Sequence, residues 1–251
     1  MLVDNKDLFV KYIPSVDGYE IDIDDNNVSE FFLTITPYLQ ESEREIINDL
    51  IGNDLYNIVK EHPTLKDHLC LLISCKAYYR AIPSLDLVHT PSGFAVVNTA
   101  NQAPASKERV ERLLQWLNVR ISDAIDQLIL LLLGNKIFRA EWAKSENFKY
   151  YTECLFLTAS SYRRYINKKA LREDLDENYS LILSYQSEIS KMISKEYLDE
   201  LIEKRRSGDL TEKDNQMITL IYPIIGLLIK GFASQGYWAQ EDLVNAMVRN
   251  L

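Results

Sequence analysis

The feature that most constrains the fold is a long segment of helical periodicity, which begins at Pro104 and ends at Gly134-Asn135. Charged and amide side chains occupy one side of this pattern, as expected for an amphipathic helix. With only 8 Gly and 7 Pro in 251 residues, the chain has few of the turn residues that a strand-rich fold needs. The sequence therefore predicts a mainly α-helical fold. The apolar side of the segment consists of Val110, Leu113, Leu114, Leu117, Ile121, Ala124, Ile125, Leu128 and Leu132.

Further helices are predicted on both sides of this segment. Thr36-Pro37 is expected to start one, because Thr can cap exposed amides and Pro is tolerated at the first helical position. Gly52 is expected to end it in a left-handed conformation. Thr64 caps a second predicted helix, which Pro83 stops. Together these segments indicate a helical bundle. Downstream, apolar spacing predicts helices over residues 146–167, 171–193, 197–205 and 212–235.

One stretch between the two long helices has the pattern of strands. Leu85, Leu87 and His89 alternate with Asp86 and Val88, Thr90-Pro91-Ser92-Gly93 can form a turn, and Phe94-Ala95-Val96-Val97 can form a returning strand. The sequence thus predicts one β-hairpin at about residues 85–98, inserted between two long helices. Because an isolated two-stranded ribbon is marginally stable, we expect it to lie on the helices or to pair with another chain.

The charge of the chain is unevenly distributed. Residues 1–66 hold 14 acidic against 5 basic residues, whereas residues 67–251 hold 23 of each, so the first segment carries the whole net charge of -9. This balance argues against general coating of nucleic acid, which depends on Lys and Arg. The best place to divide the chain is after residue 135. The predicted parts are a helical domain with the hairpin (1–135) and a C-terminal helical region (136–251), with a single domain as the alternative.

The chain has no pattern of export or membrane insertion. Met1-Leu2-Val3-Asp4 lacks a basic segment followed by an apolar one, so we expect no secretory signal and a cytoplasmic protein. The longest apolar stretch, residues 218–233, contains Pro223 and Lys230 and falls short of the roughly 20 residues that span a bilayer. We expect no membrane contact. The three cysteines lie among apolar residues and are expected to be packing residues: Cys70, Cys75 and Cys154.

No pattern of a catalytic or cofactor site occurs in the sequence. It lacks the phosphate-binding P-loop, the dinucleotide-binding glycine motif, the serine nucleophile elbow and the HExxH zinc motif. The sequence predicts a non-enzymatic protein with no catalytic residue, no cofactor and no metal. Two sets of residues imitate a site. His62, His68 and His89 with Cys70 and Cys75 fit no zinc spacing, and Glu41, Glu43 and Glu45 are expected in the first turns of a helix, where acids favour the dipole.

A compact basic cluster, interleaved with two tyrosines, has two interpretations. It could touch a phosphate backbone while the aromatic rings stack on bases, which would make the protein a cytoplasmic helical module that binds nucleic acid. Alternatively, it closes the C-terminus of a helix, where cations are favoured and their long stems cover apolar surface. Both interpretations remain open at this point. The cluster consists of Arg163, Arg164, Lys168, Lys169 and Arg172, with Tyr162 and Tyr165 between them.

The hairpin and the start of the long helix carry a resemblance. The matching residues are Thr90-Pro91-x-Gly93-Phe94, Val96-Val97 and Ala103-Pro104-Ala105-Ser106-x-x-Arg109-Val110, with a weaker match from Tyr38 through Leu50-Ile51-Gly52-x-x-Leu55-Tyr56. Over Leu85 to Leu114 the chain resembles an uncharacterised family from phages and prophages of gut bacteria. That family looks like helical head-to-tail connector, or adaptor, proteins.

This resemblance implies a ring-forming adaptor between the capsid portal and the tail or neck, assembled in the cytoplasm and then part of the virion. The implied partners are further copies of the chain and the portal, tail or neck proteins. The edge of a ribbon can add strands to a neighbour, and an acidic segment could line a DNA passage without binding tightly to it. The candidate subunit-interface residues are Thr90, Pro91, Gly93, Phe94, Val96 and Val97.

Overall fold

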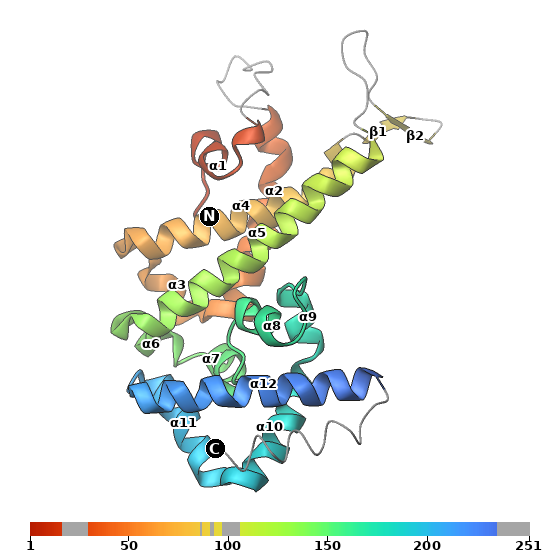
Figure 1. The fold of residues 1–251 in the computed structure, drawn as a ribbon. Helices are drawn as coiled ribbons and strands as arrows, with labels where there is room; N and C mark the ends of the chain where they lie inside the picture. Colours follow the sequence, from red (N-terminus) through yellow and green to blue (C-terminus); the bar gives the residue numbers. More distant parts are fainter. Residues whose placement is uncertain (17–29, 86, 91–92, 97–105, 235–251) are drawn as a thin grey trace. The chain divides into compact units, whose positions relative to one another are not determined.

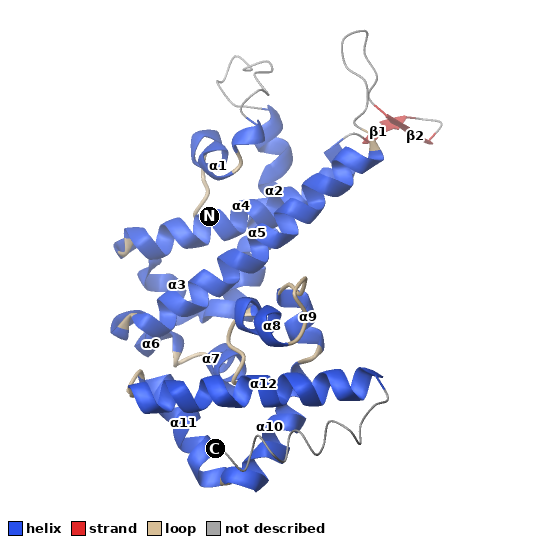
Figure 2. Cartoon of the chain, in the orientation of Figure 1, coloured by secondary structure: helices blue, strands red, loops and turns tan. Residues whose placement is uncertain are grey.

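The computed structural model describes residues 1–16, 30–85, 87–90, 93–96 and 106–234. Helices make up most of these residues, so the prediction of a mainly α-helical fold is confirmed (Figures 1 and 2). The chain forms two compact units, Met1–Ala124 (unit 1) and Ile125–Leu251 (unit 2). The division falls inside the long helix α5 (Lys107–Gly134), whereas the sequence placed it after that helix.

Unit 1 is built around the packing of α2 against α4. The apolar side chains that fill its core include Ile35, Leu39, Leu69 and Ile73, which are fully buried or nearly so. Its elements in chain order are α1 (Lys6–Tyr12), η1 (Pro14–Val16), α2 (Glu30–Ile46), the π-helical turn η2 (Ile47–Ile51), α3 (Gly52–Ile58), η3 (Val59–Glu61), α4 (Pro63–Leu85), β1 (Leu87–Thr90), β2 (Gly93–Val96) and the first part of α5.

Helix α2 begins earlier than the sequence predicted. Its first residue is Glu30, and Pro37 lies inside it. The Thr36 hydroxyl does not cap a helix start but donates to the Phe32 carbonyl oxygen one turn back, at 2.7 Å. The predicted end of this helical segment at Gly52 agrees better with the structure. Gly52 follows η2 and has φ 76°, which glycine adopts readily. Its ψ of 164° is extended, so the chain does not form a left-handed helix end there.

Because the sequence predicted a later start for α2, it also placed three acidic residues too near the beginning of that helix. Glu41, Glu43 and Glu45 lie in the second half of the helix, so the explanation from its N-terminal dipole is wrong. All three have tertiary partners instead, and the contacts of Glu43 and Glu45 are the closest. Buried Glu43 accepts hydrogen bonds from the Tyr56 hydroxyl (2.8 Å) and from the Leu2 amide (2.7 Å), and Glu45 binds two cations of α4. These carboxylates stabilise the packing of unit 1.

Glu45 gives unit 1 a predicted dependence on pH. Burial alone would raise the pKa of its carboxyl, but the hydrogen bond from Lys76 (2.6 Å) and the charges of Lys76 and Arg80 lower it below the ordinary value of 4.5. A carboxyl with a lowered pKa stabilises the folded state above the unfolded pKa and loses that effect as pH falls through the folded value. Glu45→Gln should therefore cost about 1 kcal/mol at neutral pH, and urea unfolding should show this difference shrinking below about pH 4.

The matched control for this prediction is Glu41→Gln. Its carboxylate is 64% exposed and lies 3.7 Å from Arg80, so water screens the pair. We expect its effect on the free energy of unfolding to stay within about 0.5 kcal/mol at every pH. A loss in Glu45→Gln that is equally large at pH 7 and pH 3 would contradict the role given to its charge.

A short antiparallel ribbon follows α4 in the chain. β1 pairs with β2 in the register Leu87↔Val96, Val88↔Ala95, His89↔Phe94 and Thr90↔Gly93. The two strands form a two-stranded sheet, and no further strand joins it among the residues that the structure describes. The ribbon lies in the chain between α4 and α5, the two longest helices of unit 1.

In the described part of unit 2, every regular element is a helix. Four of its helices begin at a side chain that caps them by accepting a hydrogen bond from a backbone amide: Asn135, Ser145, Thr158 and Ser194. Apolar residues of α10, α11 and α12 pack around the segment that precedes α8. Its elements are the end of α5, α6 (Lys136–Trp142), α7 (Glu146–Glu153), α8 (Ala159–Tyr165), α9 (Arg172–Glu177), α10 (Tyr179–Ile193), α11 (Lys195–Ser207) and α12 (Glu212–Ser234).

The helix predicted over residues 146–167 is interrupted by a buried connector, residues 154–158. Cys154 has an extended backbone that ends α7, and Thr158 caps the start of α8 by accepting from the Ser161 amide at 3.1 Å. The helix predicted over 171–193 is likewise divided, into α9 and α10 at Asn178. Three connector side chains, Cys154, Leu155 and Phe156, are nonetheless apolar and buried, so the periodicity located core residues correctly but not the breaks between helices.

Polar side chains from four different helices hold the backbone next to this connector. Arg205 of α11 donates to three carbonyl oxygens at 2.8–2.9 Å, and Tyr222 of α12 donates to one of the same oxygens at 3.1 Å. Gln186 of α10 accepts from the Leu155 amide (2.9 Å) and donates to a carbonyl (3.1 Å), and Arg172 of α9 donates to another (2.9 Å). The carbonyls belong to Thr152, Glu153, Cys154, Leu155 and Leu157. A break in helical structure needs such partners when it is buried.

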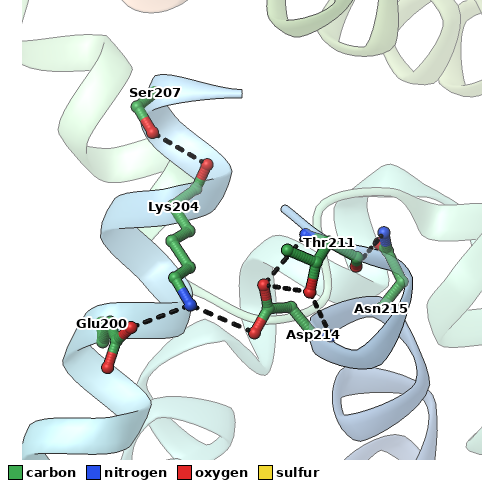
Figure 3. A network of polar contacts seen from close by, with 6 residues as sticks. All are labelled: Glu200, Lys204, Ser207, Thr211, Asp214 and Asn215. Carbon is green, nitrogen blue, oxygen red and sulfur yellow. Dashed lines mark hydrogen bonds and ion pairs between the residues drawn. The ribbon is translucent and has the colours of Figure 1, made fainter. Parts of the chain in front are cut away.

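A polar network closes the turn between α11 and α12 (Figure 3). Gly208 ends α11 at φ 80°, a left-handed conformation in which glycine carries no steric penalty. Asp214 then accepts from the amide and the hydroxyl of Thr211 at 2.9 and 2.7 Å, which caps the start of α12. Lys204 bridges Glu200 of its own helix and Asp214 at 2.8 and 3.3 Å. The corner is therefore fixed by residues from both of its helices.

Candidate functional site

The ribbon is the first candidate surface. Thr90, Gly93, Phe94 and Val96 lie in β1 and β2, at the register given above. Pro91 and Val97, the other two predicted interface residues, lie outside the described residues. A two-stranded sheet has two outer edges, each with a row of amide and carbonyl groups that a strand of another chain can bind. The geometry of the backbone therefore suits strand addition.

Helix α5 carries large apolar side chains on its surface in the part that belongs to unit 1. Trp116 is 45% exposed and Val119 is 37% exposed, and the Arg120 guanidinium lies 5.1 Å from the centre of the Trp116 ring. Neither Trp116 nor Val119 belongs to the apolar stripe identified in the sequence. Apolar residues that lie off the stripe of an amphipathic helix were the signal that could have found this surface.

The basic cluster is the second candidate, and the structure divides it. Arg172 is only 6% exposed. Its guanidinium binds Asp176 at 2.9 Å and the Leu157 carbonyl at 2.9 Å, and it lies 4.9 Å from the centre of the Tyr151 ring. The prediction that Arg172 belongs to a surface that contacts nucleic acid is therefore wrong, because its charge is used inside unit 2.

Arg163 and Tyr165 are also engaged within the fold. The Arg163 guanidinium donates to the Ser160 hydroxyl at 3.2 Å, next to the start of α8, where Asp126 accepts from the Ser160 amide and hydroxyl. The Tyr165 ring packs against Tyr222 with ring centres 5.3 Å apart. Helix α12 approaches this point so closely that a Cβ on Gly226 would lie 2.9 Å from the Tyr165 carbonyl oxygen. Tyr165 is half-buried, and its ring already has an aromatic partner within the fold.

Three cations of the cluster remain on the surface: Arg164, Lys168 and Lys169. Within the described part of the chain their side chains make no ion pair. Arg164 is in the last turn of α8, and the two lysines lie in the turn that follows. The Asn167 side chain accepts from the Lys169 amide at 3.1 Å and the Asn167 carbonyl accepts from the Ala170 amide at 3.0 Å, which holds the backbone of this turn.

The residues that could bind a metal are dispersed in the parts of the chain that the structure describes. No three His, Cys, Asp or Glu residues come together there. Cys70, Cys75 and Cys154 are free and buried, as the prediction of packing residues requires. Burial raises the pKa of each thiol to about 11, so all three are protonated at neutral pH. Over the same residues, no helix has the length and apolar character that crossing a bilayer demands.

Comparison with known proteins relates part of the chain to a protein family. No curated protein and no solved structure matches the chain. Residues 31–152 match the model of a protein family described as a family of unknown function, DUF6712. The matched segment runs from α2 to the end of α7 and so includes the ribbon and the whole of α5. Over these residues the chain is similar to that family of unknown function.

Proposed function

We propose that this protein is a structural, non-enzymatic component of a phage or prophage virion. It acts as a head-to-tail connector, or adaptor, that assembles as a ring of identical subunits between the portal and the tail or neck. Assembly takes place in the cytoplasm, the finished ring belongs to the virion, and DNA passes through it without tight binding. The ribbon Leu87–Val96 lies at the contact between subunits. The proposal joins the resemblance of the hairpin segment to the geometry of the ribbon.

The single observation that carries the proposal is the ribbon with its two outer edges. A two-stranded ribbon gains stability when a further strand or surface covers it. Its insertion between α4 and α5 makes it an element that one subunit can extend to another. Contact between a ribbon and a different surface of the next copy is heterologous, and such contacts close into rings when the rotation between copies permits.

The exposed apolar side chains of α5 support the same proposal. Trp116 and Val119 lie on the helix that follows the ribbon in the chain, and tryptophan is enriched at the centres of protein interfaces. The opening turns of α5 carry two ion pairs, Lys107 with Glu111 and Glu108 with Arg112. An apolar centre next to a charged rim is the composition of a typical interface.

Replacement of the ribbon tests this function. In the variant, Leu87–Val96 is exchanged for a Gly-Ser linker of the same length, and the full chain is sized by light scattering over a range of concentrations. We expect the natural chain to form an oligomer of one fixed mass, alone or when mixed with the portal protein, and the variant to remain a monomer. Far-ultraviolet circular dichroism should show the same helical content in both, because the helices do not depend on the ribbon.

The control is a variant in which Arg164, Lys168 and Lys169 are replaced by Gln, far from the ribbon in sequence, and which should assemble like the natural chain. A natural chain that stays monomeric at every concentration, with and without the portal protein, would end the proposal. A ribbon variant that forms the same oligomer as the natural chain would instead remove the ribbon from the contact.

A further inference from the structure

A surface in unit 2 concentrates positive charge that the fold itself does not use. Between Glu153 and Glu173 the sequence contains five cations and no acidic residue. Two of the five, Arg163 and Arg172, bind groups of the fold, as described above. The other three are exposed, and we call Arg164, Lys168 and Lys169 the basic turn. Together the three side chains carry about three positive charges, which no ion pair neutralises among the residues that the structure describes.

Helix capping does not explain the basic turn. Favourable interaction with the dipole of a helix falls off beyond its last turn. Helix α8 ends at Tyr165, and the Ile166 amide closes it by donating to the Tyr162 carbonyl at 2.9 Å. Lys168 and Lys169 lie beyond that point, with exposed side chains, while buried Ala170 anchors the turn to the core. A favourable interaction with the C-terminus of α8 can therefore explain the position of Arg164, but not those of Lys168 and Lys169.

The partner that suits the basic turn follows from what surrounds it. Tyr162 is 3% exposed and packs on Phe156, and half-buried Tyr165 packs on Tyr222, so neither ring stands free on the surface as a stacking platform. Proteins that bind single strands combine positive charge with exposed stacking rings. A duplex keeps its bases stacked and presents its phosphates outward, so it needs charge alone. This comparison selects a duplex over a single strand.

We infer that the basic turn contacts the phosphate backbone of double-stranded DNA, without reading its sequence. The inference is independent of ring assembly, because it concerns unit 2 and a different set of residues from the ribbon. A single copy with three phosphate contacts binds weakly. Several copies in one assembly would bind the same duplex together, and the linked contacts would raise the observed affinity. A chain with a net charge of -9 can make this contact because unit 2 lacks the acidic excess of residues 1–66.

Fluorescence anisotropy with a short labelled DNA duplex tests the inference on the full chain. The logarithm of the association constant should fall with the logarithm of salt concentration with a slope of about -2.7 per subunit in contact, which corresponds to three phosphates. In the variant R164Q/K168Q/K169Q, binding at about 50 mM salt should fall by more than about tenfold, and the slope should flatten by about 1 for each cation removed. Two duplexes of unrelated sequence should bind equally.

The matched control is K136Q/K195Q/K213Q, which removes the same charge from three exposed lysines elsewhere in unit 2. It should keep most of the affinity and the slope. The inference is overturned by an absence of binding at about 50 mM salt, by equal losses in the two triple variants, or by tighter binding to the single strand of the same sequence. Light scattering of the basic-turn variant separates this result from assembly, because its oligomeric state should match that of the natural chain.

Discussion

Arg205→Met is expected to lower the free energy of unfolding by about 3 kcal/mol, because three carbonyl oxygens lose a hydrogen bond and only that of Leu155 keeps a second side-chain donor, Tyr222. Arg205 is 6% exposed and binds the carbonyls of Thr152, Cys154 and Leu155 at 2.8–2.9 Å, and within the described residues it makes no ion pair. Burial lowers the pKa of its guanidinium, which shows that the charge is held at a cost in free energy. Methionine removes that cost and fills a similar volume, which limits the net loss.

The comparison with two other variants isolates the role of the guanidinium. Arg205→Lys keeps the charge but offers a single ammonium in place of the planar fork, so we expect it to lose most of the same stability. Arg164→Met makes the same chemical change as Arg205→Met at an exposed site and should stay within about 0.5 kcal/mol. Denaturant unfolding gives the magnitudes. Hydrogen exchange should locate the loss of protection in α7, α8 and α11, and unchanged exchange there would contradict the role of Arg205.

Trp142→Ala is expected to cost about 3–5 kcal/mol, the largest effect of any single change considered for this protein. Trp142 ends α6 and is fully buried, with its ring 5.3 Å from that of Phe148 in an edge-on arrangement and 6.2 Å from that of Tyr151. Alanine would leave a cavity that the surrounding helices fill only in part. Denaturant unfolding followed by circular dichroism measures the loss.

Trp116 supplies the control for Trp142, because it is the same residue type at the surface. With 45% of Trp116 exposed, Trp116→Ala should change the stability of the folded chain by less than about 1 kcal/mol. Its effect should instead be on assembly, if the exposed face of α5 belongs to the subunit contact. Equal losses of stability in Trp116→Ala and Trp142→Ala would contradict the difference in burial on which both predictions depend.

The sequence predicts the long helices of this fold but not the interruptions between the shorter ones. The apolar stripe of α5 predicts a long helix that the structure contains, since the alternation of buried and exposed faces is a local property of the sequence. The interruption at residues 154–158 has no comparable signal. It is stabilised by Arg172, Gln186, Arg205 and Tyr222, which come from four helices and meet only in the folded chain.

The basic cluster shows the same limit for the candidate site. Its composition indicates a positive surface, and spacing along the chain makes its five cations look equivalent. The fold separates them, because Asp176, the Leu157 carbonyl and the Tyr151 ring bind Arg172 inside unit 2. Burial of Tyr162 and packing of Tyr165 then remove the aromatic half of the predicted site.

By itself, the sequence determined the helical class, the identity of most core residues and the uneven charge, because each depends on composition or on periodicity within one segment. Only the tertiary structure decided where the helices break, which acids of α2 are buried and which cations remain at the surface. Those outcomes depend on hydrogen bonds and ion pairs between residues that are distant in the chain, such as Glu45 with Lys76 and Arg205 with Thr152. Local sequence patterns do not show which distant residues will become partners in the folded chain.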